Sequence, residues 1–365
     1  MHSTTAERWR SILMFAFYNN MKYLLTIVLT FLFLLKTEAQ QQFKVAVVAF
    51  YNVENLFDTI NQLDVQDDEF TPQGELNYNG KIYLDKLQKL SSVISQIGTN
   101  FSPDGPALLG VAEIENDTVL RDLAQMPLLK GRNYKWVHYN SPDTRGIDVA
   151  LFYNPKYFTV DTSHSLFVEL PGGAKDAYFT RDVLWVQGQF DGETIHVYVN
   201  HWPSRRGGEE RSAPGRAAAA GVIKRHMDSL MKKQPDAKVV IMGDLNDDPT
   251  SASIVEVLRA RGKVAEVKPG GLFNPWMELY KKGIGTLAYQ DAWGLFDQII
   301  ISHAWLDKSQ SGFFYHQPHV FRKEYMVENQ GRFKGYPMRT WDGSSYRGGY
   351  SDHFPTFLVL LKRVP

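Results

Sequence analysis

The sequence predicts a single α/β domain in which β-sheets are covered by helices. Two observations carry this prediction: eight short runs rich in β-branched and aromatic residues, and three stretches with apolar residues at helical spacing. Beyond the N-terminal segment, no internal repeat and no Pro- or Ser-rich linker divides the chain. The 365 residues are therefore expected to form one large domain rather than two.

The predicted strands are short, and several have polar residues only at their ends, as strands buried on both faces do. They are FKVAVVAF (43–50), ALLGVA (107–112), DVALFY (148–153), VLWVQGQF (183–190), TIHVYVN (194–200), KVVIMG (238–243), DQIIIS (297–302) and TFLVLL (356–361).

Three helices are predicted between these strands. Residues 81–97 place five leucines and isoleucines on one face, and Gly98 ends the helix. A second helix opens at Pro214 and continues to residue 233, and a shorter one spans 250–260. The loops at 61–80, 165–180 and 331–350 are rich in Gly, Asp or aromatic residues and are expected to carry specificity.

The composition narrows the chemistry. Apolar residues make up 44% of the chain and charged residues 22%, which excludes disorder, collagen and coiled coil. Lys plus Arg equals Asp plus Glu at 40 each, which argues against a nucleic-acid partner held by bulk charge alone. The absence of cysteine excludes disulfides, thiol catalysis and zinc–thiolate sites. Catalysis must use His, carboxylates, Asn, Arg or hydroxyls.

The N-terminal segment, residues 1–39, is interpreted as an extension followed by a signal peptide, with Met21 as the expected start. An apolar run of 13 residues, Tyr23–Leu35, follows Met21-Lys22 and ends near Thr37-Glu38-Ala39-Gln40. A membrane-spanning helix needs roughly 20 apolar residues, so no stable membrane anchor is expected. The alternative is a buried helix. The preferred interpretation predicts export to the periplasm or the cell exterior, with residues 40–365 as the mature domain.

Polar side chains gather where the predicted strands end. Taken alone, an Asn or Asp after a strand is usually a turn former, and an isolated His is usually a satisfied polar residue. Here six strand ends supply carboxylates, amides or imidazoles, which a rigid scaffold can bring together. They are Asn52 to Asn55, Glu113 to Asn116, Asn200 to Arg206, Asp244 to Asn246, Asp297, and Ser351 to His353.

These motifs, in order, resemble the endonuclease/exonuclease/phosphatase superfamily, over nearly all of the chain from about residue 43 to residue 361. They read YNVEN, AEIEN, RGIDVALFY, NHWPSR, MGDLND, FDQIIIS and GGYSDHFP. The superfamily includes deoxyribonuclease-I-like nucleases, abasic-site endonucleases, inositol polyphosphate 5-phosphatases and bacterial sphingomyelinases. The resemblance, to an exported bacterial-type member, implies a four-layer sandwich, with two mainly antiparallel β-sheets packed face to face and helices outside. The site would lie at one end of the sandwich.

The resemblance further implies metal-assisted hydrolysis of a phosphoester. Hard oxygen ligands suit Mg²⁺, Mn²⁺ or Ca²⁺. Glu113 matches the principal ligand and Asn52 the amide at the first strand end. Glu54 is assigned a second or outer position, and Asp352 is placed toward the metal.

On the opposite side, His353 is the expected base for water, with Asp297 as the partner that fixes its tautomer. Asp244 and Asn246 would orient the nucleophile or donate to the phosphate, provided that this segment stays extended. His201 would protonate the leaving oxygen or grip a nonbridging one.

Substrate contacts are expected from arginines. Arg145 matches a phosphate-contacting position, against the alternative of a surface turn residue. Arg205 and Arg206 begin a segment of four arginines, 205–216, that either tracks a nucleic-acid backbone or is a solvated, partly self-paired loop. The aromatic loop 332–350 either stacks bases or contacts a membrane surface, or else packs its own rings on the sandwich.

A nuclease acting on DNA or RNA as a monomer is the favoured function. Asp247 and Asp248 would repel a polyanionic headgroup, which counts against the inositol phosphatases. A sphingomyelinase-like phospholipid hydrolase or a small-molecule phosphodiesterase or phosphatase is the alternative. A non-catalytic binding protein is the rival class.

Overall fold

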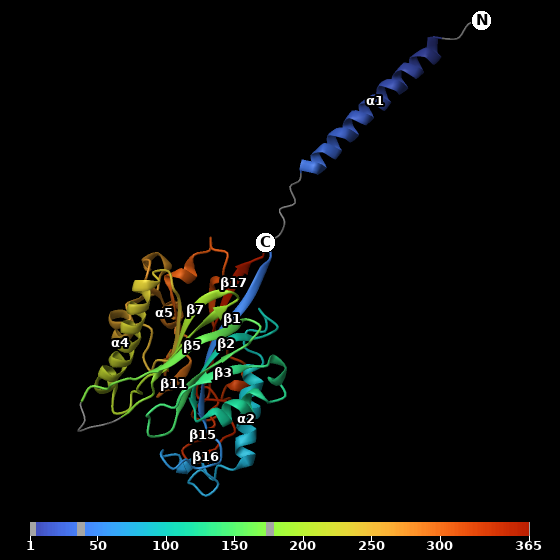
Figure 1. Ribbon diagram of the computed structural model, residues 1–365. Coiled ribbons are helices and arrows are strands. Elements are labelled where there is room, and N and C mark those ends of the chain that lie inside the picture. The colour runs from blue at the N-terminus through green and yellow to red at the C-terminus, as the bar shows by residue number, and fades with distance from the viewer. Residues whose placement is uncertain (1–4, 35–40, 173–178, 365) are drawn as a thin grey trace. The chain divides into compact units, whose positions relative to one another are not determined.

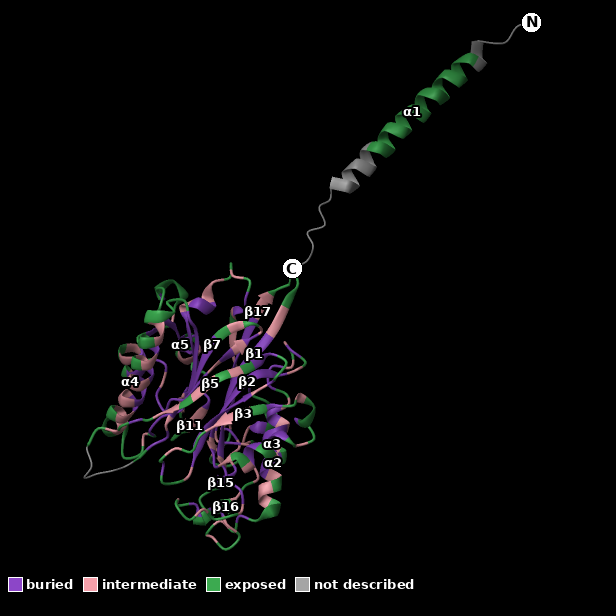
Figure 2. Ribbon diagram, in the orientation of Figure 1, coloured by how far each residue is buried: buried purple, intermediate pink, exposed green. Residues whose placement is uncertain are grey.

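The computed structural model describes residues 5–34, 41–172 and 179–364. The chain forms two units, Phe43–Arg363 and a second made by the N-terminal segment to Gln42 with the last two residues. The larger unit contains two large β-sheets whose strands are mostly buried, while most of its exposed residues lie in loops and on the outer sides of the helices (Figures 1 and 2).

The first sheet has six strands in the order β14-β17-β1-β2-β4-β3. Only the β1–β2 pair is parallel. Its strands are β1 (Phe43–Leu56), β2 (Pro106–Ile114), β3 (Lys135–His138), β4 (Asp148–Tyr153), β14 (Phe314–Val320) and β17 (Thr356–Arg363).

The second sheet has seven strands in the order β5-β6-β7-β8-β13-β10-β9, with parallel pairs at β7–β8 and β10–β9. Its strands are β5 (Phe158–Leu166), β6 (Val183–Phe190), β7 (Glu193–His201), β8 (Lys238–Asp244), β9 (Ala260–Arg261), β10 (Leu272–Phe273) and β13 (Asp297–Ser302). Two small hairpins are β11 (Leu287–Tyr289) with β12 (Ala292–Gly294), and β15 (Trp341–Asp342) with β16 (Ser345–Tyr346).

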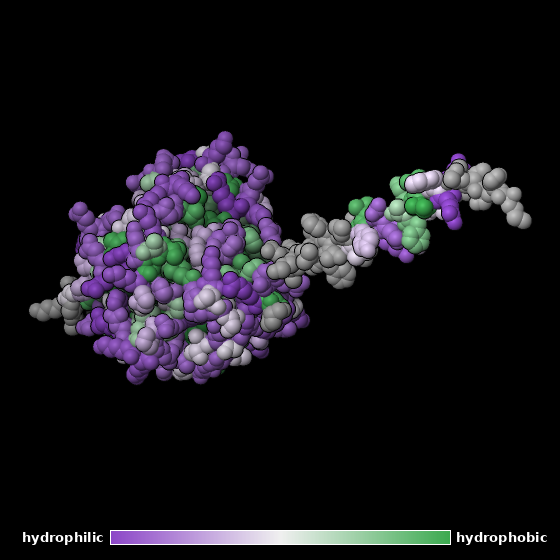
Figure 3. All heavy atoms as spheres, turned by 90° about the horizontal axis from the view of Figure 1, so that it is seen from above, coloured by the Kyte–Doolittle hydropathy of each residue, from purple (hydrophilic) through white to green (hydrophobic). Residues whose placement is uncertain are grey.

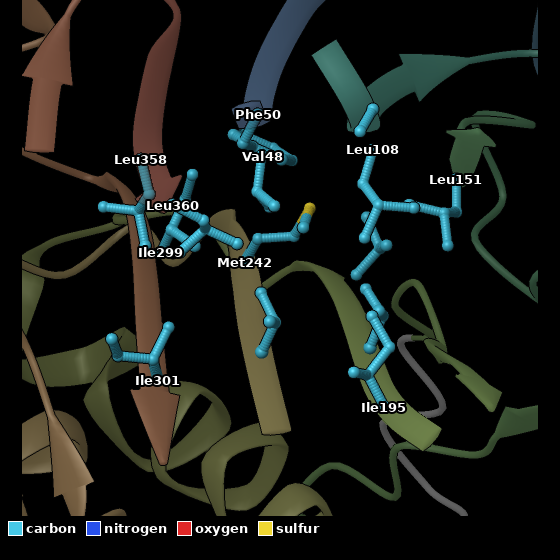
Figure 4. Close-up of a cluster of buried hydrophobic side chains, with 14 of the residues drawn as sticks. Val48, Phe50, Leu108, Leu151, Ile195, Met242, Ile299, Ile301, Leu358 and Leu360 are labelled. Carbon is cyan, nitrogen blue, oxygen red and sulfur yellow. The ribbon is translucent and has the colours of Figure 1, made fainter. Parts of the chain in front are cut away.

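The inner faces of the two sheets pack against each other. Figure 4 shows side chains from both sheets pointing toward one another, among them Val48 and Leu358 from the first sheet and Met242 and Ile299 from the second. Period-two alternation gives each central strand one face for this core and one face for a helix layer. In β8, Val240 and Met242 belong to the inter-sheet core, whereas Val239 and Ile241 belong to the outer cluster.

Helices cover both outer faces, which completes four layers. Helices α2 (Gly80–Ile94) and α3 (Asp117–Ala124) pack their apolar faces on the first sheet, and α4 (Glu209–Lys233) packs on the second. Asn79 caps α2 and Asn116 caps α3, each by accepting hydrogen bonds from two backbone N–H groups. The predicted four-layer sandwich of mainly antiparallel sheets is confirmed.

All eight predicted strands form, three of them with the predicted bounds, and the strands not predicted are mostly at sheet edges. Edge strands β3, β5 and β14 have mostly half-exposed residues, so they lack the apolar signal. The prediction that the second helix opens at Pro214 is wrong, because α4 begins five residues earlier at Glu209. There the Ser212 hydroxyl and the Arg216 guanidinium bind the carbonyl oxygen of Glu209. The predicted helix over 250–260 is reduced to one π-helical turn, Ser253–Val257.

An aromatic cluster extends the first sheet beyond its strand ends. Phe57 stacks on Phe70 with ring centroids 4.0 Å apart, and Tyr78 donates to the carbonyl oxygen of Phe57 at 3.0 Å. Trp341 joins this cluster, and Tyr346 packs on it. These two rings of the 332–350 loop therefore pack on the domain, in line with the alternative in which the loop packs its own aromatics.

The N-terminal unit contains one helix, α1 (Thr5–Leu34). Its described side chains, residues 8–26, are all exposed. The choice between a signal peptide and a buried helix stays a prediction. The expected cleavage region at residues 37–40 lies outside the described residues. None of the described helices has the length and apolarity needed to cross a membrane.

Candidate active site

The strand ends that carry polar residues meet between the two sheets. Asn52 follows Phe50, His201 follows Val199 and Asp244 follows Met242 at the next inward-facing position. Strand register also aligns the second sheet: Asp244 pairs with His201 on β7 and with Asp297 on β13. The same alternation that fills the core therefore delivers these side chains to one end of it.

His353 and Asp297 form a buried pair at this end. His353 Nδ1 lies 2.7 Å from Asp297 Oδ2, and Asp297 is fully buried. Ser351 shapes the turn that presents the imidazole, because its hydroxyl donates to the carbonyl oxygen of Asn52 and accepts from the His353 N–H. With Nδ1 bonded to a carboxylate, Nε2 is left free to face the site.

Asp244 lies at the centre of the group. Its Oδ2 is 3.8 Å from His353 Nε2 and 3.7 Å from His201 Nε2, and it accepts a hydrogen bond from Asn52 Nδ2 at 3.0 Å. Its Oδ1 accepts the backbone N–H of Asn246. Asp244 therefore touches both imidazoles and links the two sheets.

Glu113 reaches the same centre from the first sheet. Its Oε1 accepts from Asn52 Nδ2 at 3.2 Å and lies 3.7 Å from His201 Nε2. The β1–β2 register shifts here, and Glu54, Asn55 and Glu113 all have positive φ. Because of this irregularity, the side chain of Glu113 departs from the regular alternation of the strand. Bulges near active sites commonly redirect a side chain in this way.

The two histidines have opposite electrostatic surroundings. Burial lowers the pKa of His353, but the charges of Asp297 and Asp244 outweigh it, so the pKa stands well above its usual value. Burial, together with the positive charges of Arg181 and Arg145, holds the pKa of His201 well below its usual value. A neutral imidazole is a poor proton donor, so His201 is better suited to donate a hydrogen bond to a phosphate oxygen than to protonate the leaving group.

Two acids of the site are hard to ionise. Burial and the nearby charge of Asp297 raise the pKa of Asp244 to about 7, against the opposing effect of His353. Burial and the charge of Asp352 likewise raise the pKa of Glu54 to about 7. In both groups burial is the largest cause of the shift, and a neighbouring carboxylate adds to it.

The carboxylate of Glu54 contacts the loop at residue 340 and Lys86. Its carboxylate accepts the N–H of Thr340 at 2.7 Å and lies 4.0 Å from the buried ammonium of Lys86. Lys86 also binds the Thr340 hydroxyl. Glu54 thus holds the 340 loop and agrees better with the outer of the two positions expected for it.

Asp352 lies at the rim, with its side chain about one-third exposed. It is 3.9 Å from His353 Nε2 and 3.4 Å from the guanidinium of Arg339. A pocket opens beside it, lined in part by Arg339, Arg347 and Phe333.

The side chain of Arg145 is half-exposed, and its charge helps to lower the pKa of His201. Arg145 therefore lies near His201 with a guanidinium that a phosphate could reach. Sequence reasoning missed Arg181, which pairs with the same aspartate, Asp143, as Arg145 does. Arg181 is buried, forms an ion pair with Asp143 at 2.9 Å and donates to the carbonyl oxygens of His201 and Trp202. It thereby holds the His201 turn. Its isolated position in a loop gave no signal in the sequence.

The expectation that residues 244–246 stay extended is wrong. Strand β8 ends at Asp244, Asn246 has φ of 49°, and its Nδ2 donates to the carbonyl oxygen of Trp202. The left-handed turn at Asn246 breaks the alternation. Asn246 fixes the His201 loop rather than pointing with Asp244.

Two of the four arginines in the segment 205–216 are paired with acids. Arg205 contacts Glu209, Asp248 and the carbonyl oxygen of Asn246, and Arg216 Nε lies 2.6 Å from Asp247 Oδ1. Of the four arginines, Arg206 and Arg211 are exposed. Because Arg205 and Arg216 neutralise Asp247 and Asp248, the repulsion argued against a polyanionic substrate loses its basis.

The donor set fits a hard divalent cation. The carboxylates of Glu113 and Asp244 converge from the two sheets, and no Lys or Arg of the described chain lies within 4.0 Å of either. Asp244, Asp297 and His353 also bring metal-capable atoms within 4.8 Å of one another. Asn52 directs its NH₂ to the carboxylates and its Oδ1 to the Glu54 N–H, so its amide would have to turn to act as a ligand.

Comparison with known proteins now decides the family. The model of the Endonuclease/Exonuclease/phosphatase family matches residues 47–362. The chain belongs to this family. Its members are metal-dependent phosphoesterases, and the chain is accordingly a hydrolase acting on phosphoester bonds. No curated protein matches the chain.

Solved structures share the fold. An endonuclease/exonuclease/phosphatase family protein from Bacteroides thetaiotaomicron aligns with a TM-score of 0.53 at 19% identity, over 89% of this chain and all of the other. A mannosyl-6-phosphatase from the same organism aligns with a TM-score of 0.53 at 18% identity, over 86% and 99%. TDP2 from C. elegans aligns with a TM-score of 0.50 at 16% identity, over 87% and 75%.

Proposed function

We propose that this chain is an exported, Mg²⁺-dependent phosphodiesterase that acts as a monomer and cleaves DNA or RNA. The carrying observation is the buried His353–Asp297 pair, whose free Nε2 faces Asp244 and the rim at Asp352. A base held by a carboxylate at the mouth of a polar site is the arrangement that activates water.

In this proposal, His353 Nε2 takes the proton of the attacking water, and Asp297 fixes the tautomer and stabilises the imidazolium. As the water oxygen bonds to phosphorus, the bond from phosphorus to the leaving oxygen breaks, and that oxygen takes a proton from solvent. Neutral His201 donates a hydrogen bond to a nonbridging oxygen, and Arg145 contacts the phosphate with its half-exposed guanidinium. Asp244 orients the water from between the imidazoles. Glu113 and Asp244 would hold the cation, which would supply polarisation of the phosphoryl oxygen.

Support for a nucleic-acid substrate is local rather than global. Arg206 and Arg211 are exposed near the His201 loop, whereas the chain has no net charge and the face seen in Figure 3 is broadly hydrophilic with small apolar patches. Local arginines can position a phosphate backbone without a basic surface.

A smaller phosphoester is the second candidate. One solved structure of the same fold is a mannosyl-6-phosphatase. Because Asp247 and Asp248 are paired with arginines, their charges no longer argue against an anionic metabolite as the substrate.

A substrate panel separates these candidates. Supercoiled DNA, single-stranded RNA, sphingomyelin, mannose 6-phosphate and bis-p-nitrophenyl phosphate are offered to the chain with Mg²⁺ and with EDTA. We expect metal-dependent nicking of DNA or cleavage of RNA. The double variant Arg206→Ala/Arg211→Ala should raise KM for long nucleic acid about tenfold and leave the small diester unchanged. Hydrolysis of the monoester or the small diester alone would transfer the proposal to a metabolite.

Export is proposed from the apolar run Tyr23–Leu35 and its flanks. When the full chain is expressed in a bacterial host, mass spectrometry of the exported fraction should find a mature N-terminus near Gln40. Recovery of only the uncleaved chain with the cells would contradict this proposal.

A further inference from the structure

A groove of about 650 Å³ adjoins the catalytic end of the domain, and nothing in the catalytic scheme uses it. Arg322, Lys334 and the rings of Trp293 and Tyr336 are among its lining residues. Trp293 also stacks on Phe354, the residue after His353, with ring centroids 6.3 Å apart. Among the described residues that line the groove there is no Asp or Glu. Its size and lining suit an anionic ligand that also has flat apolar parts.

A row of three rings leads from this groove to the rim of the catalytic site. The ring centroids of Trp293 and Tyr336 are 6.1 Å apart, and those of Tyr336 and Phe333 are 5.8 Å apart. Phe333 lines the pocket beside Asp352, and Tyr336 lines both that pocket and the groove. All three rings are half-buried, so each keeps surface that a ligand can reach.

Guanidinium groups accompany the row of rings. The Arg322 guanidinium lies 5.9 Å from the ring centroid of Trp293, and the Arg339 guanidinium lies 5.7 Å from that of Phe333. The row therefore alternates apolar ring surface with positive charge.

The charge of this region is only partly compensated. Residues 322–339 contain five basic and two acidic residues, in a chain whose net charge is zero. Among the residues that the structure describes, Arg322 and Lys334 have no carboxylate oxygen within 4.0 Å, and Arg339 has only that of Asp352, at 3.4 Å. These cations are therefore available to an anionic ligand.

The loop that carries two of the rings is held in place. The Glu328 N–H donates to the carbonyl oxygen of Tyr336 at 2.8 Å, and the Gly335 N–H donates to that of Glu328 at 2.7 Å. The Tyr336 hydroxyl accepts the backbone N–H of Asp291 and donates to its carboxylate, each at 2.6 Å. The loop is thus tied to the β11–β12 hairpin, and a preorganised surface loses less entropy when it binds a ligand.

We propose that a single-stranded stretch of the nucleic-acid substrate, next to the reacting phosphate, binds along these rings and cations. We call them the strip: Trp293, Phe333, Tyr336, Arg322, Lys334 and Arg339. The inference rests on the proposed nuclease function and extends it to the strand that flanks the cleaved bond. Proteins that bind single strands combine cations that follow the backbone with aromatic side chains on which bases stack, and the strip offers both.

The test is the binding of a short fluorescein-labelled single-stranded DNA, followed by fluorescence anisotropy in EDTA so that no strand is cleaved. Phe333→Ala should weaken binding about tenfold without changing its salt dependence, because it removes a stacking surface and no charge. Phe333→Tyr should restore the affinity. Arg322→Ala/Lys334→Ala should also weaken binding about tenfold. Its slope of log Kd against log salt concentration should fall by about 1.4, since each phosphate contact to a single strand contributes about 0.7.

The matched control is Lys268→Ala/Lys308→Ala, which removes two exposed lysines outside the strip. It should bind the strand as the wild-type chain does, and Tm is recorded for every variant to establish that it folds. Wild-type binding by the strip variants, or an equal loss in the control, would overturn the strip. A wild-type chain that binds no strand would overturn both the strip and the nucleic-acid substrate. Hydrolysis of the small diester by the wild-type chain tests the catalytic proposal separately.

Discussion

His353→Asn should lower kcat by about 10³-fold while the fold stays intact. Asparagine places an amide donor where His353 Nδ1 stands, so Asp297 keeps a hydrogen-bond partner, whereas Nε2 and its basicity are lost. The measurement is steady-state hydrolysis of bis-p-nitrophenyl phosphate in saturating Mg²⁺, with Tm recorded on the same preparation.

The control variant is His353→Ala, which removes the donor as well. Asp297 is completely buried, so it would be left as an unpaired buried charge, and we expect a drop in Tm in addition to the lost activity. A near wild-type rate in His353→Asn would show that another group activates water and would refute the assignment of the base.

Asp297→Asn should reduce kcat/KM by an amount on the order of 10³-fold and shift its acid limb to lower pH. The charge of Asp297 raises the pKa of His353, and a base works only when it is deprotonated. In the native chain, activity should therefore rise with pH through a His353 pKa above its ordinary value. Removing the charge lowers that pKa, so the rise occurs earlier but reaches a lower plateau.

The pH profile of kcat/KM, measured for both chains with the small diester, checks this prediction. The stability of Asp297→Asn should be recorded in parallel, because a purely structural role would change Tm and kcat without moving the acid limb. An acid limb at the same pH in both chains would mean that the charge of Asp297 does not control the pKa of the catalytic base.

Much of the site could be predicted from the sequence because it follows from strand alternation. Asn52, His201, Asp244 and Asp297 are the polar positions that continue an apolar inward face, and strand register then aligns them. The central strands could also be predicted from the sequence, because a strand buried on both faces is an apolar run with polar residues at its ends.

The parts that sequence reasoning missed depend on turns and long-range pairs. Asn246 leaves the extended pattern through a left-handed turn, and Arg205 turns back to the acids that follow β8. Arg181 acts through an ion pair with Asp143, 38 residues away. None of these contacts is accompanied by a local sequence periodicity from which it could be predicted.

The most direct test of the central claim is a metal titration on the small diester. The wild-type chain and His353→Asn are stripped with EDTA, dialysed, and assayed for hydrolysis of bis-p-nitrophenyl phosphate as Mg²⁺ is returned. We expect no turnover before Mg²⁺ is added, recovery in the wild-type chain, and about 10³-fold less recovery in His353→Asn. Turnover by the stripped wild-type chain, or equal recovery in both chains, would contradict it.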